Sequence, residues 1–309
     1  MKPLQSLYTM ARNLKRFWLN LRVHVDDAIT FARASGLLQE DQPGVLAGQV
    51  LKTAHRLDKG LSLPDPQPGH GLQAAQLLSR QLQGHLRLSG ADWVWQSGRA
   101  ALARRARHEA GVPASELGVA MRAREVQEAA SGAFPELVRV RRSVRQFAPG
   151  PVCIESLKRA CELAALSPSA CNRSGGRVWI ATEVEQRRRV LALQDGHQGF
   201  GEQAAAVAVV TADTSAFHTV AERHQAWVDG GLFAMTLLYA LQHEGLGTCC
   251  LNWCVQPSTD RRFKRSVGIP LNETVVMLIA IGALPDEFTV AHSPRRPLDE
   301  VMHGLGSHT

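Results

Sequence analysis

Apolar residues recur every three or four positions at the start of the chain, which predicts an amphipathic helix. The residues on the shared face are Leu4, Leu7, Tyr8, Ala11, Leu14, Trp18 and Leu21, and the basic remainder consists of Lys2, Arg12, Lys15, Arg16 and Arg22. Three interpretations stay open for this segment. The helix could pack on its own protein, it could lie on a membrane surface because basic amphipathic helices bind anionic bilayers, or the segment could be disordered.

Helical spacing continues through most of the first 130 residues. Helices are expected over residues 26–37, 45–57, 72–88, 91–110 and 115–130. Residues 63–71 are expected to form a loop because they contain three prolines and two glycines. The segment SGAFP at residues 131–135 then interrupts the pattern. We therefore expect an all-helical N-terminal extension over residues 1–133, of unassigned role, and a second domain over residues 134–309.

The pattern changes beyond this boundary, where short apolar runs alternate with amphipathic segments. The apolar runs predict strands at residues 177–181, 204–211, 248–253 and 274–282. The intervening segments predict helices at residues 154–166, 182–193, 225–244 and 258–266. Strands that alternate with helices predict an α+β domain in which helices cover a sheet.

The chain of 309 residues carries a formal net charge of +7. A basic chain can attract nucleic acid, acidic membranes or anionic cofactors. The arginines lie in short scattered clusters instead of one basic tail, so we do not expect nucleic-acid binding. We find no secretory signal and no run of about 18 uncharged apolar residues, which predicts a cytoplasmic protein without a transmembrane helix.

The six cysteines do not follow a metal-binding pattern. No two of them form a CxxC pair, so we expect free thiols in a reducing compartment and no structural zinc. The sequence also lacks the GxxxxGK[ST] phosphate loop, the HExxH metalloprotease motif and the GxSxG nucleophile motif. Residues 199–204 match a dinucleotide-binding GxGxxA pattern, but they precede a predicted strand instead of following one, so we reject that interpretation.

A basic segment at residues 141–147 (RRSVRQF) precedes the first helix of the second domain. In an extended conformation Arg141, Ser143 and Arg145 point to the same side of the chain. Two guanidinium groups and a hydroxyl suit a phosphate, because arginine donates bidentate charge-assisted hydrogen bonds. The segment therefore predicts an anion-binding site.

Three further motifs could contribute to such a site. Residues 167–173 (SPSACNR) place small polar groups on a turn after a predicted helix. Residues 245–253 (GLGTCCLNW) place glycines before a strand of small residues, so that a flat ring could approach the backbone. Residues 293–298 (SPRRPL) form a second basic turn near the end of the sequence.

These four motifs, in this order and at these separations, resemble those of the FMN-dependent nitroreductase family. Members of that family carry an RRSxRxF-like segment, an SPSxxNxQPW-like turn, a GxG(T/S)CW-like strand and a KxR(R)PL-like C-terminal turn. The resemblance extends over residues 141–303, about half of the chain, and leaves residues 1–130 unassigned. It implies a mixed, mostly antiparallel sheet flanked by helices, in an intertwined homodimer with FMN at the interface.

The resemblance assigns candidate cofactor contacts residue by residue. Arg141 and Ser143 match positions that hold the phosphate and ribityl chain of FMN, and Arg145 matches a basic residue that faces the N1/O2 edge of the flavin ring. Arg142 is a further candidate ligand, with helix capping as the alternative. The remaining candidates are the turn residues Pro168, Ser169, Ala170 and Asn172 from the other subunit, His197 at the polar edge of the ring, the strand residues Cys250, Leu251 and Asn252 beside flavin N5, and Arg295 at the phosphate.

The chain departs from the family's pattern at three places. Ser174, Gly175 and Gly176 replace the usual Gln-Pro-Trp, Ser293 replaces a lysine, and residues 251–254 (LNWC) replace a glycine-rich strand end. The resemblance therefore gives neither the shape of the substrate pocket nor the electron acceptor.

The resemblance implies an enzyme in which NAD(P)H delivers a hydride to FMN and a small organic acceptor is then reduced, in ping-pong order. A nitro compound, a quinone, an enone or a second flavin are the candidate acceptors. No protein acid or base is obligatory, because the cofactor carries the reaction. An alternative is a non-catalytic flavin-binding redox sensor or membrane-peripheral adaptor, which the altered 174–176 segment and the long N-terminal extension favour slightly.

Overall fold

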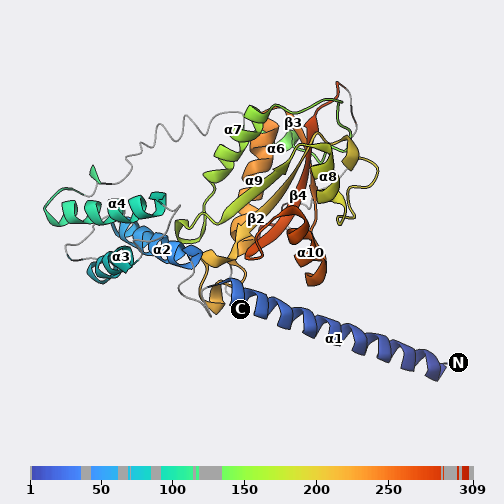
Figure 1. Cartoon of the computed structure of the whole chain (residues 1–309), viewed down its shortest axis with the longest axis horizontal. Helices are drawn as coiled ribbons and strands as arrows, with labels where there is room; N and C mark the ends of the chain where they lie inside the picture. Colours follow the sequence, from blue (N-terminus) through green and yellow to red (C-terminus); the bar gives the residue numbers. More distant parts are fainter. Residues whose placement is uncertain are drawn as a thin grey trace.

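The computed structural model describes residues 2–35, 43–61, 69, 71–84, 92–113, 116, 117, 134–286, 288, 298 and 301–305. Within this part, residues before 134 are helical wherever they form regular structure, and residues from 134 onward contain a sheet enclosed between helices (Figure 1). The predicted combination of a helical extension and an α+β domain is confirmed.

Four apolar runs form the sheet, namely β1 (Gly176–Ala181), β2 (Ala206–Asp213), β3 (Leu246–Leu251) and β4 (Glu273–Ala283). Their order in the sheet is β1-β2-β4-β3, and each pair of neighbours is antiparallel. The expected mostly antiparallel sheet is therefore confirmed, and β3 lies at one of its edges.

Helices cover both faces of this sheet. Those of the domain with at least eight residues are α7 (Ile154–Ala165), α8 (Val184–Leu191), α9 (Gln225–His243) and α10 (Pro257–Val267). Successive side chains of a strand point to opposite faces. Val207 and Val209 of β2 accordingly pack with residues of α8 and α10, whereas Ala208 and Val210 pack with residues of α7 and α9. The sheet is thus the middle layer of three.

The N-terminal extension contains α1 (Lys2–Ala34), α2 (Pro43–Leu61), α3 (Leu72–Gly84) and α4 (Asp92–Glu109). Helices α2, α3 and α4 share a small core of their own that includes Leu57, Leu78 and Ala101. The expected helix at residues 115–130 falls almost entirely outside the described residues.

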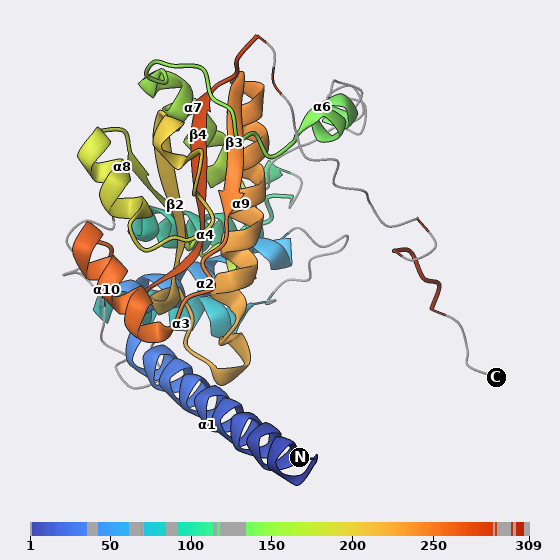
Figure 2. The ribbon, with the colours of Figure 1, turned by 90° about the vertical axis from the view of Figure 1, so that its right-hand side faces the viewer.

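Two expectations about α1 are corrected. The chain forms one continuous helix instead of ending near Leu21 and restarting at Asp26, because no proline or glycine interrupts residues 4–35. The interpretation that the apolar stripe packs on its own protein is also wrong, as far as its side chains are described. Leu14, Trp18 and Leu21 are exposed, because only the C-terminal part of α1 contacts the rest of the molecule (Figure 2).

The extension is attached to the α+β domain through α2. A Cβ atom added at Gly48 would lie 2.8 Å from the backbone oxygen of Ala216, the last residue of the short helix η4 (Thr214–Ala216). Such a close approach of backbones is possible only for glycine. Phe31 of α1 adds an apolar contact to the cluster of Ala212, Ala216 and Phe217. The two parts of the chain therefore share a packed boundary.

Candidate functional site

The segment that carries the predicted arginines lies along the open edge of the sheet. The N–H of Val144 donates to the carbonyl oxygen of Thr248 in β3 at 2.8 Å, and the N–H of Ala148 donates to that of Ala283 in β4 at 2.9 Å. These two bonds hold the segment extended against the end of the sheet, with Ser143 in a parallel bridge to Thr248.

Two buried apolar side chains anchor the segment and turn its polar groups outward. Val144 and Phe147 belong to the core, and Phe147 packs so tightly on β4 that a Cβ at Gly282 would lie 2.7 Å from its ring. Arg141 and Ser143 are half-buried and Arg145 is exposed. The segment is thus extended, as the sequence analysis assumed, and these three alternate residues lie outside the core.

Arg141 and Arg145 bring positive charge to this edge without a counter-ion in the described part of the chain. Burial raises the pKa of the Cys249 thiol, and the charge of Arg145 opposes that rise. Desolvation by the surrounding protein likewise raises the pKa of the Cys250 thiol, although that residue is exposed, and the charge of Arg141 opposes the rise. These thiols therefore stay protonated at neutral pH, which does not support a nucleophilic role for either of them.

Arg142 has a different environment from its neighbours. Its guanidinium donates to the carbonyl oxygens of Arg139 and Arg141, the former at the C-terminal end of α6 (Phe134–Val140). The side chain is thus engaged in capping that helix, which favours the capping interpretation of this residue over the role of a ligand.

A turn after α8 reaches the same edge and contains His197. Its Nδ1 lies 2.5 Å from the carbonyl oxygen of Gln194, and Nε2 of Gln194 donates to the carbonyl oxygen of Asn252 at 3.2 Å. Gln194 therefore joins the two candidate residues His197 and Asn252, which are 55 positions apart in the sequence. Leu251, between Cys250 and Asn252, has a buried side chain and offers only its backbone.

Gln194 is a residue that the sequence analysis did not single out. Its side chain is buried at 3% exposure, yet its Oε1 has no hydrogen-bond partner among the described residues. A buried acceptor without a donor is costly, so it marks a place where a ligand could supply one. A glutamine at the end of an amphipathic helix gives no sequence signal for this arrangement.

Arg145 is connected to the same turn. Its guanidinium carbon lies 6.0 Å from the centre of the Phe200 ring, and the N–H of Phe200 donates to the carbonyl oxygen of His197 at 3.2 Å. The structure therefore brings together Arg145, His197 and Asn252 from three separate segments. The distance to the ring is at the outer limit of a cation–π contact, so Phe200 supports the position of Arg145 only weakly.

The SPSACN turn lies at the opposite end of the domain. Residues 141–148 are bonded to Thr248 of β3, which follows the C-terminal end of α9, whereas Ala170 is bonded to Asp229 near the N-terminal end of that 19-residue helix. Helix α7 has 12 residues, which corresponds to a length of about 18 Å. One copy of the chain therefore does not bring this turn next to Arg145.

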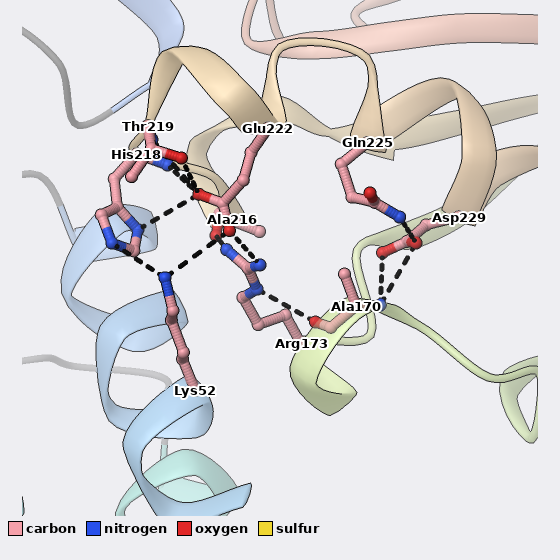
Figure 3. Close-up of polar contacts among 9 residues, drawn as sticks. All are labelled: Lys52, Ala170, Arg173, Ala216, His218, Thr219, Glu222, Gln225 and Asp229. Atoms are coloured by element: carbon pink, nitrogen blue, oxygen red, sulfur yellow. Dashed lines mark hydrogen bonds and ion pairs between the residues drawn. The ribbon is translucent and has the colours of Figure 1, made fainter. Parts of the chain in front are cut away.

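A network of polar contacts holds that turn in place (Figure 3). The buried carboxylate of Asp229 accepts the N–H of Ala170, with its two oxygens at 3.1 and 3.2 Å. The side chain of Arg173 donates to the carbonyl oxygens of Ala170 and Ala216, at 3.0 and 2.8 Å, and to Glu222. The turn is thus fixed by α9 and by the segment that follows β2.

Glu222 connects this network to the N-terminal extension. Its carboxylate lies 3.6 Å from Nζ of Lys52 in α2, and Figure 3 shows it between Lys52 and Arg173. Burial tends to raise the pKa of Glu222, but the hydrogen bonds from Arg173, His218 and Thr219 outweigh it and lower the pKa to about 2. The carboxylate is therefore charged at neutral pH.

The altered segment after Asn172 has a packing explanation. A Cβ at Gly176 would lie 2.7 Å from the ring of Phe233 in α9, so a larger residue does not fit at the start of β1. Arg295, the remaining candidate, lies outside the described residues, and so does Ser293.

Comparison with known proteins finds a family that matches the part of the chain with the first three motifs. Residues 138–194 and 183–283 match the model of the nitroreductase family. This part of the chain belongs to the nitroreductase family. The match includes Arg141, Ser143, Arg145, His197 and Asn252. No protein of curated function matches the chain significantly.

The nitroreductase domain is also similar to solved structures. An FMN-dependent nitroreductase of Clostridium difficile has 20% sequence identity and a TM-score of 0.47, with 55% of this chain and 98% of that chain covered. A nitroreductase family protein of Streptococcus pneumoniae has 19% identity and a TM-score of 0.47, with coverages of 55% and 99%. A candidate nitroreductase of Desulfovibrio desulfuricans in complex with FMN has 20% identity and a TM-score of 0.49, with coverages of 57% and 98%.

Proposed function

We propose that this chain is an FMN-dependent oxidoreductase. The observation that supports the proposal most strongly is the presence of two unpaired arginines and one unpaired acceptor near the edge of β3, within the described part of the chain. Arg141 and Arg145 have no carboxylate partner in the described residues, and the buried Oε1 of Gln194 has no donor there. An anionic cofactor that also brings N–H and O–H groups would satisfy both kinds of group, and FMN has this composition.

The residues at this edge fit distinct parts of the cofactor. Arg141 and Ser143 would hold the phosphate and the ribityl chain. Arg145 would lie at the N1/O2 edge of the ring, where a fixed cation stabilises the negative charge of the reduced form. The backbone of Cys250 and Asn252 would lie against the ring, because β3 has no neighbouring strand on that side beyond Thr248.

The chemistry that bound FMN would supply is two-electron transfer from NAD(P)H to a small organic acceptor, such as a nitro compound, a quinone, an enone or a flavin, in ping-pong order. The protein residues bind the ring, orient it and balance its charge. Gln194 positions His197 and Asn252 through its carbonyl and its amide, and its Oε1 would also accept a hydrogen bond from the cofactor.

The proposed working unit is a homodimer. Pro168, Ser169, Ala170 and Asn172 lie about one helix length from Arg141 within one chain, so only a second copy would bring this turn to the site. Helix α9 offers an apolar surface for that copy, since Trp227, Val228 and Leu232 are exposed. Light scattering of the parent protein and of Leu232→Arg would test this, with a dimeric parent and a monomeric variant as the expected result.

The visible spectrum of the purified protein tests the cofactor. We expect a bound flavin whose absorbance bleaches when NADPH is added without oxygen. On flavin-stripped protein, FMN at a hundred times its dissociation constant should stabilise the fold by about 2.7 kcal/mol. Arg141→Ala should weaken FMN binding about tenfold to a hundredfold, whereas the neighbouring Arg142→Ala should not, because Arg142 caps α6. A stripped protein that neither binds FMN nor gains stability from it would contradict the proposal.

A further inference from the structure

Helix α1 presents an apolar stripe to solvent. The helix has 33 residues, and its N-terminal part extends away from the rest of the molecule in both views (Figures 1 and 2). Several of its large apolar side chains are between 44% and 65% exposed. They are Met10, Leu14, Phe17, Trp18, Leu19, Leu21 and Val25. Apart from Leu19, their spacing of three, four and seven positions places them on one face of the helix.

The other face of α1 attaches the helix to its own protein. Val23, Asp26, Asp27 and Thr30 line a cavity of about 1130 Å³ between α1, α10 and the end of the sheet. Asp26 accepts a hydrogen bond from Nη1 of Arg261 in α10 at 2.9 Å. The α1 residues that line this cavity are mostly polar, with Ile29 at the end of the stripe among the exceptions, whereas the apolar residues from Met10 to Leu21 lie outside it. This orientation is the reverse of an amphipathic helix that packs on its own core.

The charge of the exposed part has a single sign. Residues 1–25 contain five basic residues, Lys2, Arg12, Lys15, Arg16 and Arg22, and no acidic residue. The first acidic residues, Asp26 and Asp27, lie on the side that faces α10. Lys15 and Arg22 are one helical turn from Trp18, at the border of the apolar stripe. An apolar stripe bordered by cations matches the chemistry of an anionic lipid surface.

We propose that the N-terminal part of α1 binds the surface of an anionic lipid bilayer. The apolar stripe enters the boundary between headgroups and acyl chains, and Lys15 and Arg22 contact lipid phosphates. Trp18 suits that boundary because its ring is apolar and its N–H is polar. The helix lies on the membrane and does not span it, since no helix among the described residues is long and apolar enough to cross a bilayer.

A second copy of α1 is a less suitable partner for the stripe. Two parallel helices would bring their basic residues together with no acidic residue to balance them. Antiparallel helices would need Asp26 and Asp27, but Asp26 is paired with Arg261 and both line the cavity next to α10. The proposal does not depend on flavin binding, because α1 is separate from the edge of β3.

Vesicle flotation of the full-length protein tests this inference. Vesicles of phosphatidylcholine with phosphatidylserine should bind the protein at low salt and release it at high salt, while vesicles of phosphatidylcholine alone should bind it weakly. Lys15→Gln and Arg22→Gln should each weaken binding about fivefold. Arg33→Gln is the matched control, because it removes the same charge from the same helix at the end attached to the body.

The double variant Leu14→Asp/Trp18→Asp tests the apolar stripe. Both side chains are exposed, so the variant should keep the melting temperature of the parent while losing vesicle binding. Absence of salt-sensitive binding by the parent would overturn the proposal, and so would equal binding by the double variant. Light scattering tests whether α1 binds a second copy of the chain instead. That result would require that the parent does not bind vesicles and that the double variant has a lower molar mass than the parent.

Discussion

The guanidinium of Arg173 is buried against the carboxylate of Glu222, with 2.5 Å between Nη2 and Oε1, although the two residues are 49 positions apart. The side chain of Arg173 is 1% exposed and lies 4.7 Å from the centre of the Phe217 ring. This pair fixes the turn after α7, and Lys52 of α2 lies 3.6 Å from the same carboxylate. Glu222 thus connects the turn to the N-terminal extension through Lys52, as Arg261 connects α10 to α1 through Asp26.

The stability of the fold should depend strongly on this arginine. Arg173→Ala removes the main partner of Glu222, leaving it only the more distant Lys52, and also removes the hydrogen bonds to Ala170 and Ala216, so it should lower the free energy of unfolding by roughly 3 kcal/mol. Arg177→Ala is the control, because Arg177 is exposed and, among the described residues, donates to the nearby carbonyls of Ser174 and Gly176 alone. Chemical denaturation of both variants measures the difference. Equal losses in the two variants would contradict the assignment.

Acid should weaken the fold through Glu222. Its pKa is lowered from the usual 4.5 to about 2, so its contribution is complete above pH 4.5 and is lost as the pH falls toward 2. Glu222→Gln should therefore reduce the loss of stability between about pH 4.5 and pH 2. The measurement is the free energy of unfolding as a function of pH. Identical slopes for the parent and the variant would show that Glu222 is not the group responsible.

Arg145 and Arg141 should affect the flavin differently. Arg145→Ala should lower the reduction potential of bound FMN and slow its reduction by NADPH even at saturating FMN, because a cation at the ring edge stabilises the reduced anion. Arg145→Lys should recover part of this effect, since the charge remains. Arg141→Ala and Arg295→Ala should instead weaken binding and keep the potential. Redox titration checks all four variants, and an equal shift in Arg141→Ala and Arg145→Ala would refute these roles.

Gln194→Leu should reduce FMN binding more than it reduces the stability of the flavin-free protein. The substitution removes the hydrogen bond to Asn252 and also removes a buried oxygen that has no partner among the described residues, so these two effects on stability oppose each other. FMN titration and thermal melting of flavin-stripped protein give the two quantities. Gln198→Leu is the control, because Gln198 is exposed in the same turn. Unchanged FMN affinity in Gln194→Leu would count against a positioning role.

Gly48→Ala should destabilise the protein although alanine is the better helix former. In an unhindered helix the exchange favours folding by about 1 kcal/mol. Here the new Cβ would lie 2.8 Å from the backbone oxygen of Ala216, so α2 must move away from η4, at a cost of about 1–3 kcal/mol. Thermal melting measures the sign of the change. A melting temperature at or above that of the parent would mean that α2 does not hold this close position in solution.

The sequence by itself determined the elements and the family. Alternating and helical apolar patterns predicted β2, β4, α9 and α10 at nearly their observed limits, because burial on one or two faces leaves a local periodic signal. The RRSVRQF segment predicted an anion site, because arginine is positively charged and donates paired hydrogen bonds in any fold. A periodic pattern does not say which surface the apolar face contacts. The pattern therefore predicted correctly that α1 is amphipathic, but not that its apolar face points away from its own protein.

Only the tertiary structure decided which residues share a site. Arg145, His197 and Asn252 meet because the sheet order β1-β2-β4-β3 leaves β3 at an edge, and this order is set by contacts between segments far apart in the chain. Gln194 and the pair of Arg173 and Glu222 gave no local signal, because a buried polar side chain is stabilised by partners that only folding supplies. The same holds for α1, whose exposed stripe follows from where Asp26 meets Arg261.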